Sequence, residues 1–233
     1  MSTPNKKLES KMVTYSQLKS VSVRESGEAF IAIDMSLIPY GYKNGMTDMK
    51  KVLGNNIVVR ATVYTKLLRA QEILQKRNPS YSLFVTYGYR SLEIQTSRFL
   101  KRLRQVSSTF FSDPISLYEE VHRSIAVPTV AGHPTGGAVD IVLTNPSTGA
   151  VLDFGSPQYD YSTKKYYVFD QTISRVAVQN RALLRNCMVD AGFAPFDGEW
   201  WHFSYGDREW AYYYKQKFAI YDQKSVSDVK RMI

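Results

Sequence analysis

An aspartate interrupts one of the most apolar segments of the chain. Asp140 lies within residues 138–143, where its neighbours are alanine, valine, isoleucine and leucine, a composition typical of a buried strand. A carboxylate buried alone in such a strand is costly, so Asp140 must be hydrogen-bonded, paired or bound to a cation. His133 precedes it by seven residues, an odd separation that would place the two on opposite faces of one continuous strand. Because the intervening segment contains a proline and two glycines, we expect a bent loop that returns His133 to Asp140.

A second carboxylate and histidine lie close together in Glu199-Trp-Trp-His202. Three residues apart, they too would face opposite sides of a regular strand. Gly198 precedes them, so we expect Glu199 at a bend and His202 in the strand. With His133 and Asp140 they supply two imidazoles, one metal-binding carboxylate and one free general base. Three protein ligands that leave a fourth position to water are typical of a catalytic zinc site, which makes hydrolysis the leading hypothesis.

Each motif taken alone also has a structural interpretation. Asp140 could be satisfied by hydrogen bonds, with His133 in an ordinary surface loop, and His202 could be a satisfied histidine in an aromatic core strand. Arg90, in Gly-Tyr-Arg, could be a surface charge at the end of a strand. We interpret His122 as a helix-face histidine with no metal role. A Ser-His-Asp site is excluded because no serine has the setting of a nucleophile elbow.

The composition is that of an ordinary globular chain of 233 residues, 44% hydrophobic and 22% charged. No run approaches the roughly 18 apolar residues of a membrane span. No apolar stretch follows the N-terminal lysines, as a secretory signal would require. The single cysteine, Cys187, excludes an internal disulfide. We therefore expect a cytoplasmic protein without a membrane partner.

The net charge of +9 raises the question of an anionic partner. Its densest cluster is Arg98, Lys101, Arg102 and Arg104, in a segment with helical periodicity. We interpret this cluster as a solvated helix face because no known nucleic-acid-binding module surrounds it. No nucleic-acid partner is expected, and the oligomeric state is not predicted.

The hydrophobic pattern predicts one α+β domain over residues 29–233, preceded by an irregular or extended lead-in over residues 1–28. Helices are expected at 58–76, after a Ser91 cap, at 114–122, at 172–191 and from an Asp207 cap through 218. Strands are expected at 30–34, 81–89, 138–143, 151–154 and 199–205, with a loop over 41–54. The buried faces of the second and fourth helices should include Leu100, Val176 and Val178.

Together the motifs resemble the zinc D,D-peptidases of peptidoglycan metabolism. Among these, the match is closest to the D-alanyl-D-alanine dipeptidases, including the type associated with vancomycin resistance. The resemblance spans roughly residues 58–211. The matching segments are Gly88-Tyr-Arg-Ser, His133-Pro-Thr-Gly-Gly-Ala-Val-Asp140, Phe154-Gly-Ser followed by Tyr159-Asp160, and Asn180-Arg-Ala-Leu-Leu through Glu199-Trp-Trp-His-Phe to Gly206-Asp207.

The resemblance implies a single α+β domain with a central antiparallel sheet flanked by helices. By motif position, His133, Asp140 and His202 look like the ligands of one zinc ion per chain. Glu199 looks like the catalytic base, and Arg90 looks like the cation that faces the scissile carbonyl. The implied activity is a zinc-dependent dipeptidase acting on D-alanyl-D-alanine or a similar small dipeptide.

Substrate recognition is the part of the pattern from which the chain departs. Asp160 looks like the acid that receives the free amino group of the dipeptide. However, Ala131 stands where the family often has serine, and the family's Tyr-Ala-Thr motif is not visible between Phe30 and Tyr42. One alternative is a D,D- or L,D-carboxypeptidase or endolysin acting on peptidoglycan peptides. Another is a non-enzymatic zinc-binding protein, against which the intact Glu199 and Arg90 argue.

Overall fold

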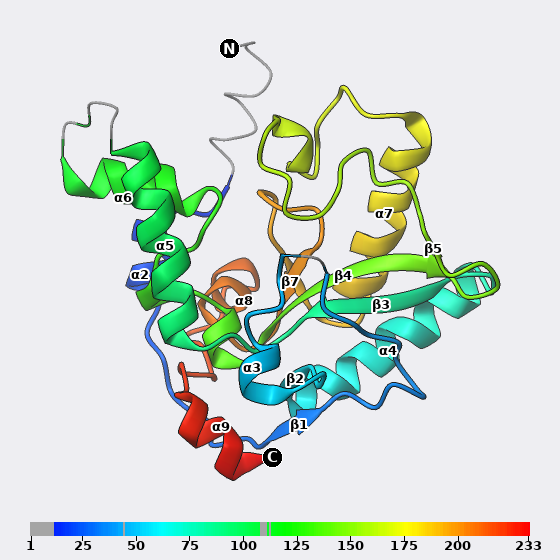
Figure 1. The fold of residues 1–233 in the computed structure, drawn as a ribbon, viewed down its shortest axis with the longest axis horizontal. Coiled ribbons are helices and arrows are strands. Elements are labelled where there is room, and N and C mark those ends of the chain that lie inside the picture. Colours follow the sequence, from blue (N-terminus) through cyan, green and yellow to red (C-terminus); the bar gives the residue numbers. More distant parts are fainter. Residues whose placement is uncertain (1–11, 44, 108–110, 112) are drawn as a thin grey trace.

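The computed structural model describes residues 12–43, 45–107, 111 and 113–233. Its central sheet is antiparallel, with the strand order β3-β4-β7-β6 and with β5 paired to the far end of β4 (Figure 1). These strands are β3 (Ser82–Tyr87), β4 (Ala138–Asn145), β5 (Ala150–Val151), β6 (Ala194–Pro195) and β7 (His202–Ser204). A second, two-stranded sheet pairs β1 (Phe30–Ala32) with β2 (Val58–Arg60).

Helices surround the central sheet, so the predicted α+β architecture is confirmed. They are α2 (Tyr15–Ser20), α3 (Lys50–Leu53), α4 (Ala61–Arg77), α5 (Leu92–Val106), α6 (Pro114–His122), α7 (Arg175–Asp190), α8 (Arg208–Tyr213) and α9 (Val226–Met232). The predicted caps of α5 and α8 are present, since the Ser91 and Asp207 side chains accept hydrogen bonds from Ile94 N and Trp210 N. Within the described residues, none of these helices combines the length and apolarity that crossing a membrane requires.

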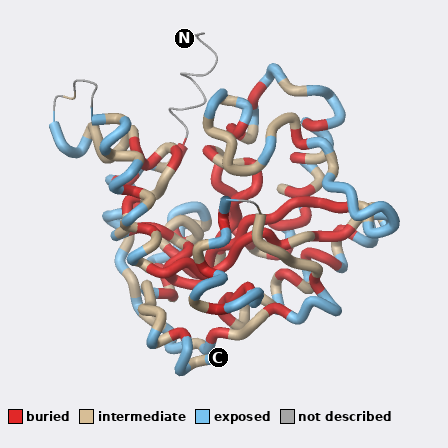
Figure 2. The backbone as a smooth tube through the Cα atoms, in the orientation of Figure 1, coloured by how far each residue is buried: buried red, intermediate tan, exposed pale blue. Residues whose placement is uncertain are grey.

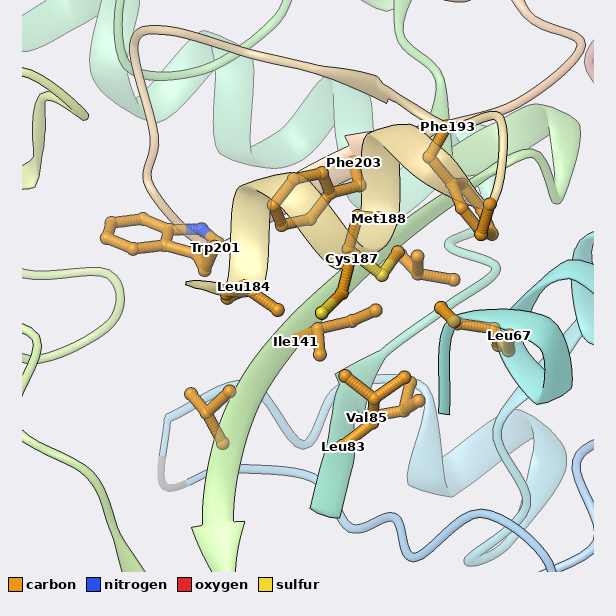
Figure 3. Packing of buried hydrophobic residues seen from close by; sticks show 14 of the residues in the cluster. Leu67, Leu83, Val85, Ile141, Leu184, Cys187, Met188, Phe193, Trp201 and Phe203 are labelled. Atoms are coloured by element: carbon orange, nitrogen blue, oxygen red, sulfur yellow. The ribbon is translucent and has the colours of Figure 1, made fainter. Parts of the chain in front are cut away.

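Alternation along the strands gives the central sheet a core face and an opposite face. On the core face, Leu83 and Val85 of β3 pair with Leu143 and Ile141 of β4. Buried side chains from α4 and α7 pack onto this face (Figure 3). Burying each such leucine, isoleucine or valine contributes roughly 1.5–3 kcal/mol. Figure 2 shows that the central strands are mostly buried and that the outer turns are mostly exposed. Asp140 alternates with the core residues and therefore lies on the opposite face.

Several predicted boundaries were wrong because tertiary pairing overrides local pattern. Residues 58–60 form β2 rather than the start of α4, since they pair with β1. The predicted loop at 41–54 contains the short helix α3, and in 151–154 only Val151 belongs to a strand. The final predicted helix ends at Tyr213, two residues before Lys215 adopts a positive φ of 52°. α9 was not predicted.

Two further expectations concern burial and the N-terminal lead-in. Leu100, Val176 and Val178 were expected to be buried but are 41%, 56% and 48% exposed. Part of the lead-in is helical rather than irregular, because α2 packs against α6 and α8. Residues 1–11 of the lead-in lie outside the described part of the chain, and the domain boundary at residue 28 stays a prediction.

The buried Arg60 connects distant segments to the turn that carries His133. Its guanidinium lies over the rings of Phe30 and Tyr221, with its central carbon 4.3 and 4.9 Å from their centroids. Nε donates a hydrogen bond to the Thr135 carbonyl at 2.8 Å, and Nη2 lies 3.1 Å from a Glu25 carboxylate oxygen. One fully buried side chain thereby joins the N-terminal segment, the C-terminal segment and the loop before β4.

We expect Arg60→Ala to lower the free energy of unfolding by about 3–5 kcal/mol, because it removes a fully buried side chain and leaves the carbonyl oxygens of Thr135 and Glu28 without their guanidinium donor. Urea denaturation followed by circular dichroism measures this loss. The control is Arg69→Ala, which removes an exposed pair with Glu72 and should cost less than about 1 kcal/mol. Equal losses in the two variants would contradict this role for Arg60.

Candidate functional site

Antiparallel pairing of β4 with β7 places Asp140 directly opposite His202. Asp140 Oδ1 lies 3.1 Å from His202 Nδ1 and 3.5 Å from His133 Nε2. One ligand atom from each of the three residues lies within 4.8 Å of the others. Two imidazole nitrogens and a carboxylate oxygen at such range form a donor set that suits a divalent metal ion. We call these three residues the metal trio.

The turn before β4 brings His133 back to Asp140 and depends on two glycines. Gly136 has a φ of +74°, and a Cβ there would lie 2.2 Å from the Phe30 ring. A Cβ on Gly137 would lie 2.4 Å from the Tyr205 carbonyl oxygen. Only glycine fits such positions without a shift of the surrounding chain. The glycine-bent return that the sequence predicted is therefore present.

The His133 ring is fixed in a form suited to metal binding. Its Nδ1 lies 2.8 Å from the Gly88 carbonyl oxygen, which can only accept a hydrogen bond. Nδ1 therefore carries the proton, and Nε2 directs its lone pair toward Asp140. Burial lowers the pKa of His133 to about 4, so the ring is neutral near pH 7. Burial opposes ionisation of Asp140, but His133 and His202 hold its pKa well below the usual range.

A β-bulge in β3 turns Tyr87 toward the site. Val85 pairs with Ile141, yet the next paired residue is Tyr87, opposite Asp140, which leaves Thr86 as the extra residue. Such a bulge redirects the side chains that follow it. Tyr87 thus lies on the same face of the sheet as Asp140 rather than on the face of Leu83 and Val85.

Arg90 lies beside the metal trio, held by contacts from two sides. Its guanidinium carbon lies 4.6 Å from the centroid of the Tyr87 ring, and that ring meets His133 edge-on. Nη1 donates a 2.7 Å hydrogen bond to the Gln95 side-chain oxygen. Nε is buried and has no hydrogen-bond partner among the described residues. Arg90 is therefore an oriented cation with donor capacity to spare.

Glu199 lies in the bend before β7, outside the metal trio. Burial raises the pKa of its carboxyl group to about 7. The Tyr161 hydroxyl donates a hydrogen bond of 2.5 Å to its Oε1. A carboxylate with a pKa near neutrality and a fixed orientation can exchange a proton with a bound molecule.

Asp160 is not brought to the metal trio. Its carboxylate accepts hydrogen bonds from the backbone N–H and the hydroxyl of Ser162, and it does not line the cavity around the trio. Its neighbours Tyr159 and Tyr161 do line that cavity, and the Tyr159 hydroxyl donates to Asp140 Oδ2 at 3.0 Å. Tyr159 has a φ of 65°, an uncommon conformation for a non-glycine residue.

A cavity of about 510 Å³ adjoins the metal trio and extends along α5. Its volume is in the range of small-molecule sites. The predicted site residues Arg90 and Glu199 share its wall with the trio. Other polar residues on the wall are Gln95, Arg98, Lys101, Arg102, Gln105, His122, Ser124, Tyr159, Tyr161 and Glu209.

The interpretation of the sequence missed some residues of this cavity and assigned others a different setting. Arg98, Lys101 and Arg102 lie on the cavity wall rather than only on a solvated face, and Arg98 is paired with Asp48. His122 is buried at the end of α6, where its Nδ1 accepts the Val127 N–H at 3.2 Å. Tyr159 and Tyr161 were missed, because they lie in a turn and loop in which Tyr159 has a positive φ, and such a segment has no periodic pattern.

Comparison with known proteins gives a family match over most of the chain. A family model described as D-ala-D-ala dipeptidase matches residues 29–224. A D-alanyl-D-alanine dipeptidase of Synechocystis sp. is 27% identical over 232 residues, which is 85% of this chain and 90% of that protein. A D-alanyl-D-alanine dipeptidase of Enterococcus faecium is 27% identical over 154 residues, covering 64% of this chain and 73% of that protein.

Solved structures give a weaker likeness. The LdcB LD-carboxypeptidase has a TM-score of 0.44 at 15% identity, covering 90% of this chain and 79% of its own. VanYB in complex with D-alanine-D-alanine has a TM-score of 0.41 at 15% identity, covering 75% and 83%. At these values the family assignment rests on the sequence match alone.

The metal trio predicts about one zinc ion bound per chain, the number that one three-ligand site holds. Equilibrium dialysis against zinc followed by elemental analysis measures this ratio. Asp140→Ala should lose the metal, because it removes the ligand between the two histidines. Asp160→Ala removes a carboxylate outside the trio and should keep it. Full metal content in Asp140→Ala would rule out this site.

Proposed function

The chain belongs to the D-ala-D-ala dipeptidase family, and on that premise we propose that it is a zinc-dependent dipeptidase hydrolysing D-alanyl-D-alanine or a similar small dipeptide. One observation carries the proposal. The metal trio and the buried carboxyl group of Glu199 face a single cavity of about 510 Å³. A metal site beside an independent proton-transfer group is the arrangement that metal-assisted peptide hydrolysis requires.

We assign His133 Nε2, Asp140 and His202 Nδ1 as the ligands of one zinc ion. The short distances of both ring nitrogens to Asp140 Oδ1 support this assignment. When bound, zinc would supply a Lewis acid that polarises the scissile carbonyl and lowers the pKa of a coordinated water molecule.

Glu199 is proposed as the general base and acid. Its carboxylate would accept a proton from the attacking water molecule and return it to the leaving amine. A pKa of about 7, raised by burial, suits both transfers because the ideal catalytic pKa lies near the operating pH. Tyr161 would hold the carboxyl group in one orientation through its hydrogen bond.

Arg90 is proposed to stabilise the negative charge that develops on the carbonyl oxygen. Its guanidinium is buried, is oriented by Gln95, and keeps Nε without a partner among the described residues. A preorganised cation in a site of low dielectric needs no reorganisation as the charge develops.

Asp160 is proposed, from the family pattern, to receive the free α-ammonium of the dipeptide. Its carboxylate does not line the cavity and accepts two hydrogen bonds from Ser162, so this role requires the loop to rearrange when substrate binds. The left-handed backbone of Tyr159 next to it is a place where such a change could occur, because a conformation of this kind is strained.

A second candidate is a carboxypeptidase acting on peptidoglycan peptides. The observation in its favour is the extension of the cavity along α5 past Arg98, Lys101 and Arg102. That extension offers room and positive charge for a longer substrate.

Substrate length decides between the two candidates. We expect the zinc-loaded protein to hydrolyse free D-alanyl-D-alanine and to cleave N-acetyl-D-alanyl-D-alanine and a pentapeptide stem poorly. The proposed pairing of Asp160 with the α-ammonium group of the substrate requires a free amino terminus, which the other two substrates lack at that position. Release of D-alanine measures all three reactions, with Glu199→Ala as the control for contaminating peptidases. Efficient cleavage of the N-blocked substrates would favour the carboxypeptidase.

Glu199→Ala should keep the metal and lose roughly 10²–10⁴ in turnover, the usual contribution of a positioned proton-transfer group. Glu199→Gln is the matched variant, because it keeps the shape and removes the proton acceptor. Zinc content and kcat measured on the same preparations separate the two effects. Release of the metal from either variant would show that Glu199 is a ligand rather than a base.

A further inference from the structure

The outer nitrogen of His202 faces a carboxylate that belongs to a different element. While Nδ1 lies against Asp140, Nε2 lies 3.3 Å from Oε2 of Glu209 in α8. The two side chains are only 11% and 12% exposed. Glu209 is therefore on the far side of the imidazole from the other two members of the metal trio.

We propose that Glu209 is a positioning residue that sets the metal affinity of the site through His202. Asp140 at Nδ1 and Glu209 at Nε2 can each accept a proton from the ring. When Nδ1 binds a metal, the Glu209 carboxylate, which can only accept a hydrogen bond, would hold the remaining ring proton on Nε2. It also fixes the rotation of the ring. The Gly88 carbonyl does the same for His133 through the opposite nitrogen. Such outer partners raise the basicity of a histidine ligand and orient it.

This inference rests on the proposed role of His202 as a metal ligand. It adds Glu209, which lies seven residues after His202 and outside the matching segments that were found in the sequence.

Contacts on two sides hold the first turn of α8 in place, and they therefore fix the backbone position from which the Glu209 side chain extends. Asp207, the cap of α8, accepts hydrogen bonds from the Ser204 hydroxyl at 2.8 Å and from Trp210 N at 2.9 Å. Gly132 packs against the same carboxylate, since a Cβ there would lie 2.1 Å from Asp207 Oδ2. The first turn of α8 is thus attached both to β7 and to the segment before His133.

The charge environment of Glu209 makes the contact with His202 a specific one. Within the described residues, His202 is the one cationic or titratable nitrogen found within 4 Å of its carboxylate oxygens. A mostly buried carboxylate that is left without a partner is costly. The pairing therefore satisfies Glu209 and orients His202 together.

Zinc affinity tests this role independently of catalysis. We expect Glu209→Ala to weaken zinc binding by roughly 10- to 100-fold, the usual effect of removing an outer partner of a metal ligand. Glu209→Gln should lose less, because the amide oxygen can still accept the Nε2 proton. Competition with a chromophoric chelator gives the affinities. The absorption spectrum of the cobalt-loaded protein should change in Glu209→Ala as the histidine loses its fixed orientation.

The matched control is Glu93→Ala. Glu93 is the second residue of α5 as Glu209 is of α8, so both variants lose an acidic side chain from a helical first turn. Glu93 is exposed and away from the cavity, so zinc affinity should not change. Thermal unfolding of the metal-free proteins shows whether each variant folds. If Glu209→Ala does not fold, the partial loss expected in Glu209→Gln still tests the role.

Zinc binding by the His202 and Glu209 variants separates a failure of the positioning role from a failure of the proposed metal site. If His202→Ala weakens zinc binding but both Glu209 variants bind zinc as the wild type does, Glu209 has no positioning role and the metal site stands. If His202→Ala itself binds zinc normally, the metal site is wrong and the inference fails with it.

Discussion

The pairing of the buried Asp140 with two histidines is the interaction on which the rest of the structure depends. Asp140 lies in an interior strand of the sheet and is almost fully buried, so water contributes little to stabilising its charge. The Tyr159 hydroxyl donates a hydrogen bond to Asp140 Oδ2, and a metal ion shared with His133 and His202 would replace the rest of that hydration. Such sharing requires the register in which Asp140 lies opposite His202. A slip of one residue would turn every side chain of β7 to the other face and move Phe203 out of the core.

The alternation of side chains along β4 and β7 places residues of the apolar core and residues of the candidate site on opposite faces of the sheet. In β7, His202 faces the cavity while its neighbour Phe203 packs in the core. In β4, Asp140 faces the cavity between the core residues Val139 and Ile141. The proposed metal ligands come from strands and from a turn fixed by two glycines. The proposed base and the tyrosines come from bends and loops beside them, where hydrogen bonds hold Tyr161 to Glu199 and Tyr159 to Asp140. A site in which each side chain is held by a neighbour suits a reaction that needs precise positioning.

The features of the fold and site that depend on neighbouring residues could be predicted from the sequence, whereas those that depend on tertiary contacts could not. The apolar run around Asp140 and the glycines before it predicted β4 and the return of His133. That Glu199 and His202 share one cavity did not follow from their spacing, because it depends on a bend set by tertiary contacts. The position of Tyr87 depends on the bulge in β3, and the position of Glu209 depends on how α8 packs against β6 and α2. Neither arrangement leaves a periodic signal in the sequence.

Diffraction from zinc-containing crystals, with data collected at the zinc absorption edge, tests the central claim most directly. The predicted result is one anomalous peak per chain, bonded to His133 Nε2, to Asp140 and to His202 Nδ1 at about 2.0–2.2 Å, with Glu199 outside the bonding distance. A peak elsewhere, coordination through His202 Nε2, or Glu199 among the bonded residues would contradict this account.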